Sequence, residues 1–347
     1  MIRDIAGRQN HSIRLARKLL KKKQRRERGL LVCEGMDLLH AAVEAEAQIH
    51  EVLVRRDLLD ALPAGLRQRA AGAGAEAKGA AGRAARQNTT PTAALDIGLC
   101  DRETLEYASA LGGGVDVIFI CAEPAWSLAD VAMAEALTFY LDGVGDPGNV
   151  GTVIRSALAF GAAGVVCSPG TADSYGPKAM RAGMGAQFLL PVVTEVPAAD
   201  LKARFNAAAA RGEVSPAVWV ADPHGGDDLR SMPLVAGPLV ILGAERAGPG
   251  TIWADARRVT IPQKGFESIN VAMAGAIFAY EVSRRAFEGA GGARGAAPRR
   301  GAGLLGDGSG GLVDVPPGVR RQQVEQDTGG LGGPRVARSV AKDEAAR

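Results

Sequence analysis

The chain has 347 residues and a formal net charge of +3 at pH 7, and 47% of its residues are hydrophobic while only 4% are aromatic. This length favours two domains, and no run of about 18 apolar residues is present that could form a transmembrane helix. The N-terminal residues lack the apolar core of a signal peptide, and the four cysteines are too widely spaced for a disulfide framework or a zinc site. We therefore expect buried free thiols, no metal centre, no membrane association and a cytoplasmic location.

The first predicted element is a basic helix over residues 13–29. This segment holds nine Lys or Arg residues and one acid, Glu27, and its apolar residues recur at helical spacing. Such a dense face of one sign repels itself unless an anion lies opposite, so it favours nucleic-acid binding over an ordinary solvated helix. A lipid surface is less favoured, because no bulky aromatic residues accompany the charge. The residues expected to contact phosphates are Arg14, Arg17, Lys18, Lys21, Lys22 and Arg25.

Residues 10–123 are predicted to form a small α/β domain. Apolar runs of strand type alternate with a segment of helical periodicity. An Ala/Gly-rich stretch without clear periodicity is expected to be a flexible insertion, and a connector is expected to follow the domain. In chain order the elements are a strand at 30–35, a helix at 36–47, a strand at 49–57, the insertion at 63–92, a strand at 115–123 and the connector at 124–135.

Residues 136–288 are predicted to form a second α/β domain. Strands alternate there with helices, which is typical of a parallel sheet with helices on both faces. Residues 289–347 are rich in Gly, Arg and Pro without a sustained period, so we expect a mostly disordered tail. The predicted strands are 136–144, 163–169, 187–193, 217–222, 238–245 and 257–263, with a helix at 148–161 after the first and a final helix at 268–287.

The glycines after the first strand of the second domain admit two interpretations. Gly143, Gly145 and Gly148 read as G-x-G-x-x-G, the spacing of a dinucleotide-binding loop, which would indicate an NAD-dependent oxidoreductase. That fold also needs an acid at the end of the second strand, and 163–169 has none. His224, the only histidine of this domain, is expected to be a loop residue rather than a catalytic one. The glycines are therefore expected to serve different chemistry.

Polar residues follow three of the predicted strands, at the edge where α/β sheets place their ligands. Each has an ordinary structural alternative: an acid at a helix start, a serine as a helix N-cap, or an arginine in an interdomain or dimer salt bridge. Their recurrence at three strand ends favours a common site. The candidate residues are Asn149, Arg155, Gly243, Glu245, Ser268 and Asn270.

Together these segments resemble the three motifs of the SpoU (TrmH) family of RNA ribose 2′-O-methyltransferases. The first motif, N-x-G-x-x-x-R-x-A-x-x-F-G, begins at Asn149, and the second, L-G-x-E-x-x-G, begins at Leu242. The third, I-P-x-x-G-x-x-S-[LI]-N-V-x-x-A, begins at Ile261. The motifs cover roughly residues 136–287, while residues 10–121 resemble the substrate-binding domain that often precedes them.

The resemblance implies a deep trefoil knot in the second domain, S-adenosylmethionine as cofactor, and a homodimer whose active site uses both subunits. Three glycines would let the knotted loops pass close to one another. They are Gly243, Gly248 and Gly265. The family's cofactor contacts, largely through backbone groups, carry over to Gly243, Ile261 and Ile269, with Leu242 beside them. Gln263 stands where the family commonly has Met.

The resemblance also assigns catalytic roles. Arg155 is expected to act on the ribose hydroxyl; because a guanidinium stays protonated, we favour a role in holding phosphate and stabilising the developing alkoxide. The residues expected to position Arg155 and the RNA are Asn149, Glu245, Ser268 and Asn270.

Several alternatives stay open from sequence alone. The N-terminal domain favours ribosomal RNA of the large subunit as the substrate over transfer RNA. A related knotted enzyme that modifies a base, and a non-catalytic RNA-binding module of the same fold, are the other hypotheses. The third motif favours ribose methylation, and the intact polar residues of all three motifs argue for catalysis.

Overall fold

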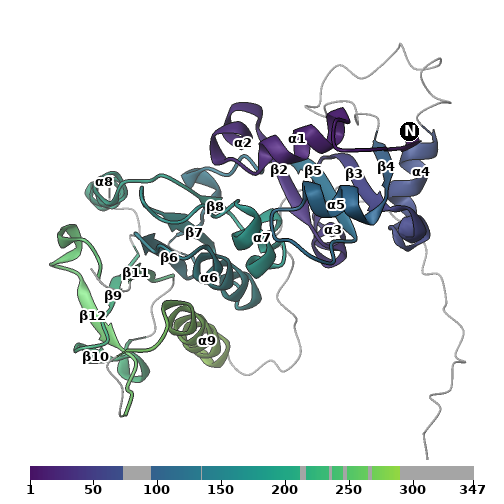
Figure 1. The fold of residues 1–347 in the computed structure, drawn as a ribbon. Helices are drawn as coiled ribbons and strands as arrows, with labels where there is room; N and C mark the ends of the chain where they lie inside the picture. Colours follow the sequence, from purple (N-terminus) through teal and green to yellow (C-terminus); the bar gives the residue numbers. More distant parts are fainter. Residues whose placement is uncertain are drawn as a thin grey trace, which may run out of the picture. The chain divides into compact units, whose positions relative to one another are not determined.

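The computed structural model describes residues 1–72, 95–133, 135–211, 216–233, 237–244, 248–264 and 268–289. They form two sheets, each packed against helices (Figure 1). No helix in these ranges is both long and apolar enough to cross a membrane. The expected tail over 289–347 lies outside the described residues, apart from Gly289 at the end of the last helix. All four cysteines are buried and free, as expected.

The first sheet has five strands and is covered on both faces. Its strand order is β1 (Ile2–Asp4), β4 (Asp96–Cys100), β3 (Ile49–Arg55), β5 (Val117–Ala122) and β2 (Leu30–Glu34). The first three run parallel, and β5 pairs antiparallel with β3 and β2. One face packs against α1 (His11–Leu19) and α5 (Arg102–Ala108), and the other against α3 (Met36–Glu44) and α4 (Ala64–Gly72).

Part of the expected insertion over 63–92 is a helix. α4 occupies its first residues and buries Leu66 and Ala70, which lie one helical turn apart. The expectation of a flexible segment is therefore wrong for this part, while residues 73–94 lie outside the described residues. The strand β4 and helix α5 that follow were not predicted.

The basic segment forms two helices where one was predicted. α1 ends at Leu19, and α2 (Lys22–Arg28) begins after Lys21, whose backbone is extended with ψ at 124°. The guanidinium of Arg25 donates to the carbonyl oxygens of Leu19 at 2.9 Å and of Leu20 at 3.0 Å. It thereby satisfies carbonyls at the helix end, which lack the backbone partners of a continuous helix. Arg25 is consequently buried and does not lie on the exposed basic face where it was expected.

The second sheet is entirely parallel, which confirms the predicted α/β class. Its seven strands run in the order β10 (Asp227–Asp228), β12 (Arg257–Thr260), β9 (Val218–Ala221), β11 (Leu239–Gly243), β6 (Thr138–Asp142), β7 (Gly164–Cys167) and β8 (Val192–Val193). Every pairing between them is parallel. The central strands are buried on both faces, which explains their continuous apolar runs.

Helices cover both faces of this sheet, as the strand–helix alternation predicted (Figure 1). α6 (Pro147–Ala159) and α9 (Val271–Gly289) lie side by side on one face, and α8 (Ala198–Ala210) packs on the other. α7 (Pro177–Gly183) packs against α6 where Gly151 permits a very close approach. A Cβ atom at Gly151 would lie 2.3 Å from the carbonyl oxygen of Ala179.

The strand predicted at 187–193 is mostly absent. Residues Ala186–Phe188 form a 3₁₀ turn, and only Val192–Val193 pair with the sheet. The cause is Gln187, whose buried side-chain amide donates to the carbonyl oxygens of Ser174 and Ala179, at 3.1 Å each. These bonds hold the apolar segment in a turn that strand propensity alone does not predict.

The trefoil knot stays a prediction. The parallel sheet agrees with it, but two segments of the loops expected to form the knot, 245–247 and 265–267, lie outside the described residues.

Candidate active site

The loop after β6 leads directly into α6. Gly143 has a positive φ of 76°, and its N–H donates to the hydroxyls of Ser168 at 2.9 Å and Thr171 at 3.2 Å. Asp146 caps α6 by accepting from the N–H of Asn149 at 3.0 Å. The Lys178 ammonium, followed by this N–H, holds the pKa of Asp146 below its usual range. Gly143 thus serves the tight turn that leads into α6.

The loop before α9 meets the start of α6. Asn270 caps α9 by accepting from the N–H groups of Ala272 at 2.8 Å and Met273 at 3.3 Å. Its side-chain amide donates to Oδ1 of Asn149 at 3.1 Å. Ser268, the cap candidate from sequence, lies two residues earlier and does not cap the helix. The hydrogen bond joins two of the predicted catalytic residues, 121 positions apart.

A pocket of about 430 Å³ opens at the carboxyl ends of β9, β11 and β12. Its lining includes five residues that the sequence assigned to the site. They are Leu242, Gly243, Ile261, Ser268 and Ile269. Among the described residues, no group of three or more His, Cys, Asp or Glu side chains is placed to hold a metal ion.

Gly243 lies where two loops press together in this pocket. A Cβ atom there would be 2.3 Å from the backbone nitrogen of Pro249 and 2.4 Å from the carbonyl carbon of Gly248. Gly248 itself has a positive φ of 65°, and its N–H donates to the carbonyl oxygen of Ala244 at 2.8 Å. The expected close passage of loops is present at this point, while Gly265 lies outside the described residues.

Sequence reasoning missed one side of the pocket. Asp222 and His224 follow β9 and line the pocket, although His224 was expected to be only a loop residue. Asp222 accepts a hydrogen bond from the backbone N–H of His224 at 2.9 Å and pairs with the guanidinium of Arg258. Their place at the carboxyl end of a parallel strand was the available signal.

Gln263 provides an unmatched polar atom in the pocket lining. Its side-chain carbonyl oxygen is buried and has no hydrogen-bond partner among the described residues. Buried acceptors in folded proteins are almost always paired. A ligand with N–H donors would supply the missing partner.

Three predicted catalytic residues are not part of the pocket lining, and they are Asn149, Arg155 and Asn270. Arg155 is exposed on α6, and its side chain makes no hydrogen bond or ion pair within the described part of the chain. Glu245 lies outside the described residues.

The predicted RNA-contacting residues divide into two groups. The first group has no acidic partner among the described side chains. It lies on the exposed face of α1 and at the residue before α2, and it comprises Arg14, Arg17, Lys18 and Lys21. Arg17 and Arg8 also lie over the ring of Tyr107, with centroid distances of 4.9 and 4.8 Å. This face keeps four cations available for an anionic partner.

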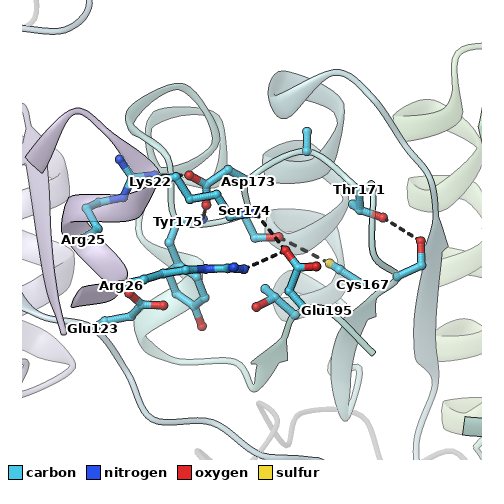
Figure 2. Close-up of a pocket in the computed structure, with 13 residues that line it drawn as sticks. Lys22, Arg25, Arg26, Glu123, Cys167, Thr171, Asp173, Ser174, Tyr175 and Glu195 are labelled. Atoms are coloured by element: carbon cyan, nitrogen blue, oxygen red, sulfur yellow. Dashed lines mark hydrogen bonds and ion pairs between the residues drawn. The ribbon is translucent and has the colours of Figure 1, made fainter. Parts of the chain in front are cut away.

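The α2 residues instead pair with acids of the second domain (Figure 2). Lys22 and Arg26 donate to the same oxygen of Glu195, at 2.9 and 2.7 Å, and hold the pKa of Glu195 below its usual range. Arg25 pairs with Asp173. Lys22 and Arg25 therefore do not belong to the unpaired basic face. The sequence did not predict these pairs, because the acidic partners lie far away along the chain.

Two segments of the chain match known families. Residues 136–280 match the SpoU rRNA Methylase family, and residues 10–84 match the MRM3-like substrate binding domain. The chain is similar to the 23S rRNA (uridine(2479)-2′-O)-methyltransferase of Streptomyces viridochromogenes, with 32% identity over 179 residues. That alignment covers 50% of this chain and 62% of the relative, so it spans less than two thirds of the relative's length.

A second relative is similar along nearly its whole length. It is the 23S rRNA (guanosine(2553)-2′-O)-methyltransferase RlmP of Bacillus subtilis (strain 168), 26% identical over 284 residues, 81% of this chain and 99% of that protein. Among solved structures, the fold resembles the SpoU methyltransferase AviRb of Streptomyces viridochromogenes in complex with AdoMet. The TM-score is 0.65 at 24% identity, covering 80% of this chain and 99% of the other. The chain thus carries a methylase domain of the SpoU family at 136–280 and an MRM3-like substrate-binding domain at 10–84.

Proposed function

We propose that this protein transfers a methyl group from S-adenosylmethionine to the 2′-hydroxyl of a ribose in large-subunit ribosomal RNA. The observation that carries the proposal is the meeting of the three motif loops. Asn149 of the first motif bonds to Asn270 of the third, and Gly243 of the second lines the same pocket as Ile269 of the third. Both relatives described above are named for 2′-O-methylation of 23S rRNA, which supports this substrate class over transfer RNA.

The pocket fits S-adenosylmethionine. Its volume of about 430 Å³ lies within the range of small-molecule sites, about 300–1,000 Å³. The orphaned oxygen of Gln263 can accept a hydrogen bond from an amino group of such a cofactor. When bound, the cofactor supplies an electrophilic methyl group. The residues that would hold it are Leu242, Gly243, Ile261 and Ile269.

The chain's own residues must orient the ribose and stabilise charge. A ribose hydroxyl becomes a good nucleophile only as its proton leaves, and alignment of the reacting atoms lowers the barrier further. Arg155 cannot accept that proton, because a guanidinium stays protonated, so the proton passes to solvent water. Arg155 instead holds RNA phosphate through two parallel hydrogen bonds and stabilises the developing alkoxide. The Asn149–Asn270 bond fixes the helix starts around the reacting ribose, with Ser268 and Glu245 supporting the RNA and the loops.

A homodimer would complete the site. α9 exposes an apolar stripe at helical spacing, which includes Met273 at 57% and Tyr280 at 53% exposure, with Ile277 between them. Large exposed apolar patches mark interaction surfaces. Tyr280 also packs edge-on against Phe160 at the end of α6, the helix that carries Arg155. Pairing through α9 would bring Arg155 toward the pocket of the partner subunit.

Charge placed on the α9 stripe is expected to break the dimer. Met273→Glu combined with Tyr280→Glu buries two carboxylates in the interface, so the variant should run as a monomer in light scattering and lose methyl transfer. Ile252→Glu, at an exposed apolar position away from α9, serves as the control and should leave the oligomer unchanged. A wild-type protein that is monomeric at working concentration would refute the dimer.

The exposed face of α1 is expected to set the salt dependence of RNA binding. Removing one cation that binds a phosphate should lower the slope of log K against log salt by about 0.7–0.9. Changing Arg14, Lys18 and Lys21 to Gln should therefore flatten the slope by about 2–3. The matched control removes three cations that pair with acids, Arg102, Lys202 and Arg230, and should keep the slope. Equal slopes for both triple variants would contradict an RNA-binding role of α1.

Methyl transfer to unmodified RNA tests the function directly. Labelled S-adenosylmethionine is incubated with the protein and with separated ribosomal and transfer RNA that lack endogenous modification. Alkali-resistant label at one internucleotide bond of large-subunit RNA is the expected result. Label found only in transfer RNA would mean that transfer RNA, and not ribosomal RNA, is the substrate. Binding of RNA and cofactor without methyl transfer would indicate a non-catalytic module. The cytoplasmic location stays a prediction.

A further inference from the structure

The side chain of Arg25 connects three elements of the protein (Figure 2). It stands on α2, donates from Nη1 to the last carbonyls of α1, and pairs through Nη2 with Asp173 in the loop after β7. Its side chain is 3% exposed, against 26% for Asp173. A buried arginine of this kind is destabilising unless its partners are present, so the contact holds all three elements in one arrangement.

The loop that contains Asp173 also builds the first motif loop. Thr171 accepts from the N–H of Gly143 and donates to the carbonyl oxygen of Leu141 at 2.8 Å. The N–H of Ala172 donates to the carbonyl oxygen of Val144 at 2.9 Å. Asp173 therefore directly follows Thr171 and Ala172, the two residues whose hydrogen bonds hold the turn into α6.

A short path of contacts consequently joins the basic helix to the catalytic loop. It begins at the C-terminal end of α1, the helix that carries the exposed cations, and passes through Arg25 to Asp173. It continues through residues 171–172 to the turn before Asn149. The exposed pairs of Lys22 and Arg26 with Glu195 lie beside this path, where solvent screens them.

Attachment of the N-terminal domain does not depend on Arg25 alone. α3 also packs on the turn after α7, where a Cβ atom at Gly185 would lie 2.8 Å from Cβ of Ala41 and 3.0 Å from Leu38. This apolar contact resists separation but is not directional. The buried Arg25, with its several hydrogen bonds, fixes the orientation of α1 and α2 relative to the loop that contains Asp173.

We propose that Arg25 and Asp173 position RNA held by α1 relative to the first motif loop, and so act in the methylation step rather than in binding. This rests on the proposed function, because it assumes that α1 holds the RNA substrate. Arg25 touches neither the proposed cofactor pocket nor the RNA in this role, and it is a positioning residue. Without the pair, both substrates bind, but the ribose is presented out of line, and small misplacements can cost about 100-fold in rate.

The test is a double-mutant cycle with Arg25→Met, Asp173→Asn and both together, with Arg102→Gln as the surface control. The single-turnover rate is measured at saturating S-adenosylmethionine and large-subunit rRNA transcript, and the affinity for each is measured separately. Each single change should lower the rate by about tenfold or more, the double variant should be no slower than either, and both affinities should be kept. Arg25→Lys should restore part of the rate, because it keeps the charge without the fork.

Amide hydrogen exchange gives a readout independent of catalysis. Asp173→Asn keeps the size of the side chain and an acceptor oxygen for Arg25, and it should speed exchange over residues 141–150 while leaving α8 unchanged. The proposal would be overturned if the rate decreases of the two single variants add in the double variant, or if only the RNA affinity falls. Unchanged amide exchange over residues 141–150 would also overturn it. A wild-type protein that methylates no RNA would refute the proposed function instead, and the exchange data would still decide the contact path.

Discussion

Arg155→Ala should abolish methyl transfer while leaving cofactor binding intact. The residue is exposed on α6, lies outside the pocket lining, and makes no pair within the described residues, so its removal disturbs neither the pocket nor the fold. Loss of one group that stabilises developing negative charge typically costs about 100- to 1,000-fold in kcat. The measurements are the single-turnover rate with rRNA and the dissociation constant for S-adenosylmethionine by calorimetry.

Two further variants make this result specific. Arg155→Lys keeps the charge but cannot hold a phosphate oxygen pair bidentately, so it should recover only a small part of the rate. Arg204→Ala removes an exposed arginine of α8 and should behave as wild type. If the dimer completes the site, mixing Arg155→Ala chains with chains defective in the pocket should restore activity in one of the two sites of each heterodimer. Near-normal turnover of Arg155→Ala would remove Arg155 from the mechanism.

The strand-end rule pointed to one edge of the parallel sheet, because polar residues follow three of the predicted strands there. The family resemblance then supplied the individual contacts Leu242, Gly243, Ile261 and Ile269, and all four line the pocket. The contact between Asn149 and Asn270 follows from the same rule applied to two motifs. Asp222 and His224 line the pocket but belong to none of the three motifs, and the strand order was needed to place them there.

The basic segment shows where local reasoning fails. Its charge pattern indicated one helix facing an anion, and only the first part of the segment, α1, has the expected face of unpaired cations. The other half is explained by Asp173 and Glu195, which lie about 150 residues or more away along the chain. An ion pair across that separation leaves no periodic signal, and the helix break at Lys21 depends on Arg25 being folded back onto α1. The wrong prediction of a strand over 187–193 has a similar cause in the buried amide of Gln187.

Gly243→Ala should displace the loop that lines the proposed cofactor pocket. The added Cβ would lie 2.3 Å from the nitrogen of Pro249, and the contact is with backbone that cannot rotate away. The opposing loop is also fixed by the N–H of Gly250, which donates to Asp142 at 2.8 Å, so relief requires the loop to move out. Overpacking of this kind costs about 1–3 kcal/mol of stability. S-adenosylmethionine affinity should fall by about tenfold or more, because the displaced loop lines the pocket.

A glycine-to-alanine change at an uncrowded position distinguishes the effect of steric crowding from the effect of losing a glycine. Gly65 in α4 has nothing within 4 Å of the added atom, and alanine is favoured over glycine in a helix by up to about 1 kcal/mol. Gly65→Ala should therefore keep or raise the melting temperature and leave cofactor affinity unchanged. Calorimetric titration with thermal unfolding of both variants checks this. Equal cofactor affinity in Gly243→Ala and wild type would mean that the loop yields, and that the crossing at Gly243 does not shape the site.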